Sequence, residues 1–289
     1  MPNYPIPEAH IADALPQLLA LLRDASALIL THYYSSSPID AAKKTDSTPL
    51  TAADIASHEF IKLRLRELFP NLPVLSEESS AATKQERLWW SDYWLVDPLD
   101  GTREFLDRTD EFTINIALIR DHQPILGLIA QPVTGTIWFG RKGWGAYRIP
   151  QGADLTTAIA LEARALNLDA TQGITVLASA RHRNEHLDRL LSYLEDRGIA
   201  VTRHDSGSAL KFPRLAEGLG DIYPRYSPCC EWDTGAGQAI VEGAGGAVLG
   251  MDAQPLSYNR HTSLMSPHFW ALADSKSDFW RSCRLQLER

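Results

Sequence analysis

The sequence predicts an α/β protein whose N-terminal half is α+β and whose C-terminal half is α/β. Residues 113–147 alternate apolar and polar side chains between turn signals, which is typical of an antiparallel meander. Residues 174–249 instead alternate strand-like and helix-like segments, which is typical of α/β units. We therefore expect two domains, an N-terminal one over residues 1–150 and a C-terminal one over residues 151–289.

The composition limits the classes of protein that this chain can belong to. Its 289 residues are 44% hydrophobic, which is enough to build a substantial core and excludes a disordered chain. With 28 basic and 36 acidic residues the net charge is −8, so no general basic field attracts a nucleic acid polymer or anionic lipid. Three cysteines cannot form a disulfide framework, which favours a cytoplasmic location. Peripheral association with the inner membrane and the oligomeric state are left open.

A first helix is expected around residues 15–30, where apolar side chains recur at helical spacing. This stretch contains Pro16, Arg23 and Asp24, so we interpret it as an amphipathic helix and expect no transmembrane segment.

A second helix is expected over residues 51–68, with Thr51 as its N-cap and Pro70 ending the pattern. Its predicted buried stripe comprises Ala53, Ala56, Phe60, Leu63 and Leu68.

The remaining elements follow in order. Strands are expected at 73–76 and 93–96, and the second is expected to stop at the polar segment 97–102. After the meander, residues 151–173 resemble a connection. The C-terminal half is then predicted to contain strand 174–178, helix 184–198, strand 199–203, helix 208–218, strand 221–223, helix 232–243, strand 247–249 and closing elements from residue 269.

The strongest chemical signal is the pair Asp97 and Asp100 directly after an apolar strand. Two carboxylates so close repel each other unless a cation lies between them. Mg²⁺ prefers such oxygen ligands, and the Leu99 carbonyl adds one more. Gly101 lets the backbone approach a ligand closely, and Thr102 offers a hydroxyl and an amide at a predicted helix start, which suits a phosphate. The structural alternative is a turn with capping acids.

Three other acidic places have ordinary explanations when each is taken singly. Glu77 ends a strand-like run, where paired glutamates are usually solvated. Asp233 begins a predicted helix, where it is expected as a cap. Asp46 and Asp54 lie among hydroxyl residues before and within the second helix, where a capped loop is the simple interpretation.

Taken together and in order, these segments resemble the motif series of the inositol monophosphatase superfamily. The matching segments are Asp46-x-Ser/Thr-Pro-x-Thr51-x-x-Asp54, Ser76-Glu77-Glu78, Asp97-Pro-Leu-Asp100-Gly-Thr102 and Trp232-Asp233-x-x-Ala236-Gly237. Residues 73–78, 93–105, 111–119 and 124–127 resemble the 3'(2'),5'-bisphosphate nucleotidase branch of that superfamily.

The resemblance implies a layered αβαβα sugar-phosphatase fold and a Mg²⁺-dependent phosphatase. Its expected reaction converts adenosine 3',5'-bisphosphate, a small phosphorylated nucleotide, to AMP and phosphate. Two or three Mg²⁺ ions are implied, held by Glu77, Asp97, the Leu99 carbonyl, Asp100 and Asp233, with Asp97 bridging. Without metal, some of these carboxylates are expected to have raised pKa values.

The resemblance also assigns roles to the remaining residues. Asp54 would orient the Thr102 hydroxyl, and Asp46 would lie near the attacking water. The substrate-binding residues would be Glu77, Leu99, Asp100, Gly101, Thr102, Gly207, Ser208, Lys211, Arg225 and Asp233. Lys211 and Arg225 would receive the second phosphate, although they could equally be ordinary surface cations. Ala209 departs from the Gly-Ser-Ser-Leu-Lys that is usual in the family.

Two rival functions stay open at this point. One is an inositol monophosphatase or fructose-1,6-bisphosphatase of the same superfamily. The other is a metal-dependent nucleotide sensor that binds without turnover.

Overall fold

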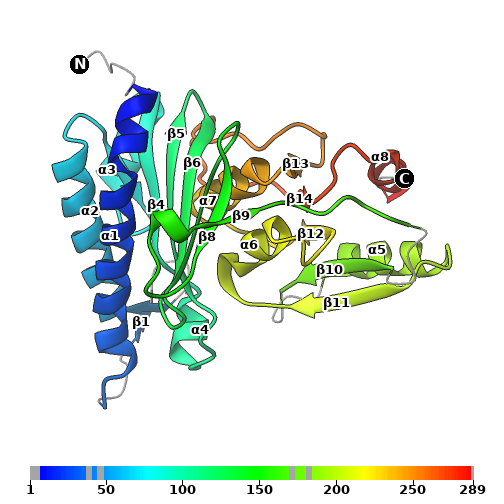
Figure 1. Cartoon of the computed structure of the whole chain (residues 1–289), viewed down its shortest axis with the longest axis horizontal. Helices are drawn as coiled ribbons and strands as arrows, with labels where there is room; N and C mark the ends of the chain where they lie inside the picture. Colours follow the sequence, from blue (N-terminus) through cyan, green and yellow to red (C-terminus); the bar gives the residue numbers. More distant parts are fainter. Residues whose placement is uncertain (1–6, 37–40, 44–48, 169–172, 180–183, 288–289) are drawn as a thin grey trace.

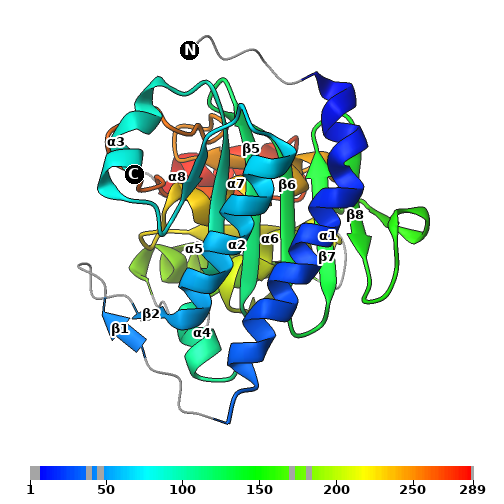
Figure 2. The same ribbon diagram turned by 90° about the vertical axis from the view of Figure 1, so that its left-hand side faces the viewer.

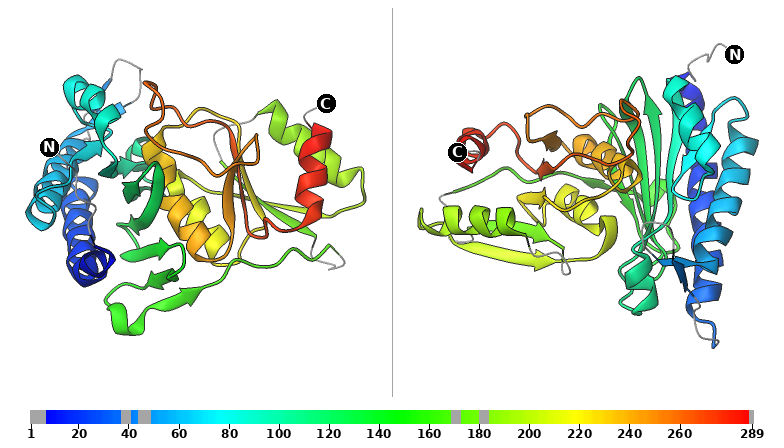
Figure 3. Two further views of the ribbon diagram at one scale, coloured as in Figure 1. Left: turned by 90° about the horizontal axis from the view of Figure 1, so that it is seen from above. Right: turned by 180° about the vertical axis from the view of Figure 1, so that it is seen from behind.

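A computed structural model describes residues 7–36, 41–43, 49–168, 173–179 and 184–287. These residues form five layers, in the order helices, sheet, helices, sheet, helices (Figures 1 and 3). This confirms the predicted layered αβαβα architecture. The helical layers are α1 (Glu8–Tyr33) with α2 (Ala52–Leu68), α6 (Lys211–Ala216) with α7 (Glu231–Gly243), and α5 (Glu185–Glu195) with α8 (Asp278–Leu287).

The first sheet has seven strands among the described residues, in the order β3-β4-β5-β6-β7-β8-β9. Their bounds are Val74–Ser76, Asp92–Asp100, Thr113–Arg120, Gln123–Gln131, Thr136–Arg141, Gly145–Ile149 and Ile159–Leu161. β3 and β4 are parallel and the other pairs are antiparallel, which confirms the meander. β9 lies in the segment expected to be only a connection, so that expectation was incomplete. The domain division at residue 150 stays a prediction.

The second sheet has the order β11-β10-β12-β14-β13 in the described part of the chain. The strands are β10 (Ile174–Ala178), β11 (Val201–Asp205), β12 (Ile222–Arg225), β13 (Ala247–Gly250) and β14 (Phe269–Leu272). The predicted alternation is confirmed, except that the helix expected over 208–218 is divided into the 3₁₀ turn η3 (Ser208–Leu210) and α6. The smaller elements are β1 (Ala41–Lys43), β2 (Pro49–Thr51), α3 (Ala81–Glu86), η1 (Arg87–Trp89), α4 (Thr102–Leu106) and η2 (Leu155–Thr157).

The expected end of the strand before Asp97 was wrong. β4 continues to Asp100, because Asp97 pairs with Asn115 and Asp100 pairs with Thr113 on β5, with a register shift between the two pairs. Backbone pairing does not depend on the polarity of the side chains. Both aspartates therefore stand at paired positions of a strand, with an irregularity between them, and not in a loose turn.

The predicted stripe of α2 was also partly wrong. Leu63 is 57% exposed, whereas the buried face includes Asp54, Ser57 and His58. Ser57 Oγ donates to the Pro98 carbonyl at 2.8 Å, so α2 contacts β4 through a polar side chain. Hydrophobic spacing does not mark such a face. The predicted N-cap is confirmed, because the Thr51 side chain accepts from the Asp54 backbone N–H.

The apolar core occupies the spaces between the layers. One cluster joins α1 and α2 to the first sheet, a second joins that sheet to the middle helices, and a third lies under α5 and α8. α1 and α2 cross one face of the first sheet (Figure 2). α1 is the one described helix long and apolar enough to cross a membrane, but its inner side chains, such as Leu22, belong to the first cluster, as in a core helix.

A close approach between α7 and the first sheet fixes how this helix packs against the sheet. A Cβ on Gly127 of β6 would lie 2.2 Å from the Ala236 carbonyl oxygen, so only glycine allows this contact. α7 consequently packs against β5, β6 and β7, and its N-terminus lies beside the end of β4.

Candidate active site

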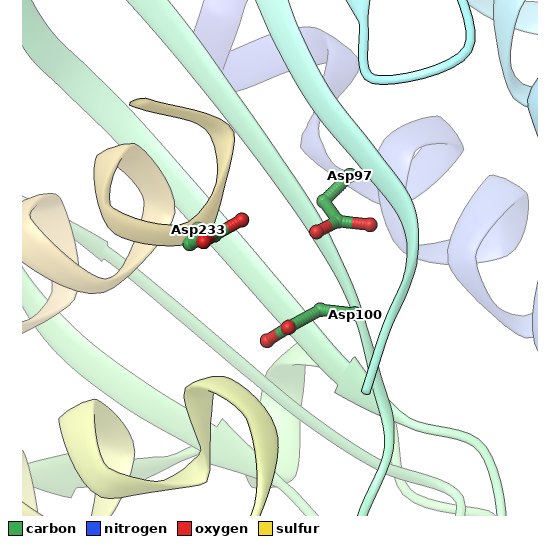
Figure 4. A group of neighbouring side chains, drawn as sticks. All are labelled: Asp97, Asp100 and Asp233. Atoms are coloured by element: carbon green, nitrogen blue, oxygen red, sulfur yellow. The ribbon is translucent and has the colours of Figure 1, made fainter. Parts of the chain in front are cut away.

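Three aspartates meet between the end of β4 and the start of α7. Asp97 and Asp100 come from β4 and Asp233 comes from the first turn of α7 (Figure 4). One carboxylate oxygen of each lies within 4.8 Å of the others. They line a cleft of about 480 Å³ that the middle helices share with the first sheet.

The local structure explains how each carboxylate is placed. On β4, Leu95 faces the middle helices, and alternation places Asp97 on the same face. The Leu99 N–H donates to Asp97 Oδ1 at 3.1 Å, which orients that carboxylate. At the start of α7, the Cys230 N–H donates to Asp233 Oδ2 at 2.9 Å as part of a capping box.

The electrostatics of this cluster indicate uncompensated negative charge. Burial, the carboxylate of Asp100 and, to a smaller extent, that of Glu77 together raise the pKa of Asp233 to about 7. This agrees with the expected raised pKa values. Oxygen ligands of this kind suit hard divalent cations, so the residues present fit a metal site.

Other residues expected to bind metal lie in the same cleft. Glu77 follows β3, its N–H donates to the Val96 carbonyl at 3.0 Å, and it lines the cleft with Leu99. It is not part of the group of three carboxylates that approach within 4.8 Å. Gly101 has φ +89°, a left-handed conformation that favours glycine and turns the chain from β4 into α4.

Thr102 and the buried Asp54 form a partly buried hydroxyl–carboxylate pair beside the aspartates. Thr102 Oγ1 lies 3.2 Å from Asp54 Oδ1 and 3.4 Å from the Leu99 carbonyl oxygen. The other oxygen of Asp54 accepts from the Thr51 N–H at 2.7 Å and from its hydroxyl at 2.5 Å. The N-cap of α2 therefore holds Asp54 against Thr102. Asp46, the third expected catalytic residue, lies outside the described residues.

Polar residues surround Asp100. Ser208 was expected among the substrate-binding residues, whereas Thr113 and Asn115 were missed by the sequence analysis. Ser208 Oγ donates to Asp100 Oδ2 at 2.6 Å and lies 2.6 Å from Thr113 Oγ1. Asn115 donates to the same carboxylate oxygen at 3.3 Å. Thr113 and Asn115 interrupt an otherwise apolar strand, at alternate positions that share one face, and this was the signal available in the sequence.

The two expected phosphate partners line the cleft but already contact the backbone. Lys211 is 1% exposed, and its ammonium donates to the carbonyls of Ser206 at 2.9 Å and Ser208 at 2.5 Å. Burial lowers its pKa to about 8, and the nearby Arg225 guanidinium also lowers it. Arg225 donates to the carbonyls of Ser227 and Pro228, each at 3.1 Å. Lys211 is therefore not an ordinary surface cation.

Gly207 completes the turn that faces these residues. Its N–H donates to Glu111 Oε2 at 2.8 Å, which ties the turn to the segment before β5. The structure thus brings together every described residue of the expected site in one cleft or in direct contact with it.

Comparison with known proteins identifies the family. A model described as the inositol monophosphatase family matches residues 13–278. The chain belongs to the inositol monophosphatase family. Relatives in this family include the 3'(2'),5'-bisphosphate nucleotidase CysQ of Salmonella typhimurium, 39% identical over 255 residues that cover 88% of this chain and 98% of the relative. CysQ of Escherichia coli K12 is 39% identical over 256 residues, with the same coverage.

Solved structures of the inositol monophosphatase family have the same fold. CysQ from Bacteroides thetaiotaomicron superposes with a TM-score of 0.75 at 34% identity, covering 89% of this chain and 97% of that structure. An IMPase of Thermotoga maritima superposes with a TM-score of 0.73 at 21% identity, covering 96% and 98%. The second similarity supports the fold alone.

Proposed function

We propose that this chain is a Mg²⁺-dependent phosphatase that hydrolyses the 3'-phosphate of adenosine 3',5'-bisphosphate, giving AMP and phosphate. The observation that carries the proposal is the convergence of three carboxylates, Asp97, Asp100 and Asp233, beside the Thr102–Asp54 pair. The named activity of the CysQ relatives supports the choice of a nucleotide substrate.

The carboxylates would hold two or three Mg²⁺ ions. Glu77, Asp97 and the Leu99 carbonyl are proposed to form one site, and Asp97, Asp100 and Asp233 a second site. When bound, a pair of such ions lowers the pKa of water and stabilises the charge of the leaving oxygen. No protein nucleophile is then needed.

The chain's own residues position the water and the phosphate. The Thr102 hydroxyl donates a hydrogen bond to Asp54, so the lone pairs of its oxygen remain to accept a hydrogen bond from the attacking water and orient it. Asp46 is proposed to lie beside that water. The amides that follow Gly101 begin α4, and a helix start of this kind favours an anion.

The second phosphate is proposed to lie on the other side of the cleft. Gly207 and Ser208 would face it, and Lys211 and Arg225 would neutralise it. Lys211 acts partly through the backbone, because its ammonium holds the carbonyls on both sides of Gly207. Arg225 provides a planar guanidinium, whose geometry suits phosphate oxygens.

A substrate panel tests this function against its rivals. Phosphate release is measured with Mg²⁺ from adenosine 3',5'-bisphosphate, AMP, inositol 1-phosphate and fructose 1,6-bisphosphate. We expect the highest kcat/KM for adenosine 3',5'-bisphosphate, loss of activity in chelator and recovery with Mg²⁺. Preference for inositol 1-phosphate or fructose 1,6-bisphosphate would favour the related phosphatases. Binding without release of phosphate would favour a sensor.

A cytoplasmic location belongs to the same proposal, since it rests on the cysteine count. The described residues add no support for association with the inner membrane.

A further inference from the structure

A second cavity lies on the opposite face of the first sheet, under α1. Figure 2 shows how α1 crosses this face. The volume of the cavity is about 380 Å³. We call it the α1 pocket. Its apolar walls include Ile11, Leu15, Leu126, Phe139, Tyr147 and Leu155.

The α1 pocket is separate from the cleft that holds the aspartates. Phe139 and Arg141 are two residues apart on β7, so their side chains lie on the same face of the sheet. Phe139 belongs to the core cluster of α1, whereas the neighbouring Trp138 belongs to the cluster of the middle helices. The sheet itself therefore stands between the α1 pocket and α7.

Arg141 is the charged residue in this apolar wall, and its hydrogen bonding is incomplete. The residue is 7% exposed. Its Nη2 pairs with Glu8 Oε1 at 2.6 Å, and Glu8 is 65% exposed. Its Nη1 is buried and has no hydrogen-bond partner among the described residues. A buried donor that lacks an acceptor costs free energy, so an added acceptor at Nη1 would be stabilising.

An aromatic ring from the β7–β8 turn covers the guanidinium. The ring of Trp144 lies over Arg141, 4.1 Å from its central carbon to the ring centroid. Trp144 is 44% exposed and stands in the β7–β8 turn between Gly143 and Gly145, both of which have positive φ. Trp144 lies outside the paired strands β7 and β8, so a ligand that displaces this ring to reach Nη1 leaves the pairing of those strands intact.

We infer that the α1 pocket binds a small monocarboxylate with an apolar body. The volume of the α1 pocket falls within the roughly 300–1,000 Å³ that is typical of small-molecule sites. The pocket is too small for a protein segment of several turns. The guanidinium fork matches a carboxylate, and the apolar walls match a hydrocarbon or aromatic body. Glu8 keeps one negative charge at Nη2, which disfavours a phosphate dianion at the same guanidinium.

Calorimetric titration of the full chain with decanoate, below its micelle concentration, tests the α1 pocket. The comparison ligand is 1-decanol, which has the same chain length and no charge. We expect decanoate to bind with one-to-one stoichiometry and at least about tenfold more tightly than decanol, because a charged hydrogen bond is gained. Arg141→Met should abolish that difference. The matched control is Lys142→Met, which removes the cation next to Arg141 in the sequence. The Lys142 side chain is 75% exposed and does not line the pocket.

Several results would overturn the inference. Equal affinity for decanoate and decanol would show that Arg141 does not recognise the charge. If decanoate does not bind, a carboxylate site is excluded. This holds whether or not the chain associates with itself at higher concentration. Competition by inorganic phosphate would place the ligand in the aspartate cleft. If Arg141→Met does not fold, the comparison of the two ligands on the unmodified chain decides the question. These outcomes are independent of the proposed phosphatase activity.

Discussion

Ser208 donates a hydrogen bond of 2.6 Å to Oδ2 of Asp100. A residue that begins η3 in the C-terminal half thus orients a carboxylate at the end of β4. Ser208 adopts φ +49°, a conformation that is uncommon for a residue other than glycine. Two contacts hold the surrounding turn: Glu111 accepts from the Gly207 N–H, and Lys211 donates to the carbonyl of Ser208.

Ser208→Ala should weaken the response to Mg²⁺ more than it weakens substrate binding. The change removes the hydroxyl that fixes Asp100, so half-saturation by Mg²⁺ should require about tenfold more metal. The measurement is phosphate release over a Mg²⁺ titration. Thr113→Val is the comparison variant, because Thr113 lies 3.5 Å from Asp100 Oδ2 and should matter less. An unaltered Mg²⁺ curve in Ser208→Ala would show that this contact does not position the carboxylate.

Thr102→Val should lower kcat while leaving KM nearly constant. The hydroxyl that Asp54 holds is proposed to act on the attacking water, and losing such a group typically costs about 10²–10⁴-fold. Thr102→Ser keeps the hydroxyl and should retain most of the rate. Steady-state kinetics of all three proteins provides the test. A change confined to KM would make Thr102 a binding residue instead.

Asp100→Asn should keep the fold but lose most activity. The amide is nearly isosteric with the carboxylate but brings no charge for a cation, so a loss of roughly 10²–10⁴-fold in kcat is expected. Thermal unfolding checks the fold, and phosphate release at increasing Mg²⁺ checks activity. Turnover close to that of the unchanged chain would mean that Asp100 is only a residue of the β4 bulge.

The sequence predicts most helices and strands well, because apolar periodicity depends on local residue choice. The layered arrangement was predicted through the resemblance of the motif series to a known family. The sequence predicts the buried face of α2 poorly, since Ser57 and His58 are buried through polar contacts with neighbouring strands. Contacts between segments that are distant in the sequence are equally difficult to predict. Ser208 lies 108 residues from Asp100, and Arg141 lies 133 residues from Glu8, so neither pair has a local signature.

His58 should make the protein less stable as the pH falls below about 6.5. Burial lowers the pKa of His58, and the Lys62 ammonium adds to this effect. The unfolded chain therefore binds the proton more readily than the folded chain does. Stability from this group is complete above the unfolded pKa of about 6.5 and is lost as the pH drops below it.

Urea unfolding at pH 7.5 and pH 5.5 measures this effect. Asparagine does not titrate, so His58→Asn should lose less stability between the two pH values than the unchanged chain loses. An Asn side chain can still contact Ser76, which lies 2.9 Å from Nδ1 of His58. His10→Asn, at an exposed position of α1, controls for the loss of any histidine. The same pH dependence in His58→Asn as in the unchanged chain would assign the acid effect to other groups.

The last prediction separates the two cations of the cleft. Lys211 is bound to the carbonyls of Ser206 and Ser208, so Lys211→Met should disturb the turn at Gly207 and lower kcat/KM for every substrate.

Arg225 instead holds carbonyls beyond the end of β12 and presents a guanidinium to the cleft. Arg225→Met should therefore act mainly on a substrate with a second phosphate. A charge-assisted contact of about 1.5–3 kcal/mol corresponds to roughly 10–150-fold in kcat/KM. The ratio of kcat/KM for adenosine 3',5'-bisphosphate to that for adenosine 3'-monophosphate should fall by this factor in Arg225→Met and recover partly in Arg225→Lys, which restores the charge without the fork. An unchanged ratio in Arg225→Met, together with an altered ratio in Lys211→Met, would transfer the recognition of the second phosphate from Arg225 to Lys211.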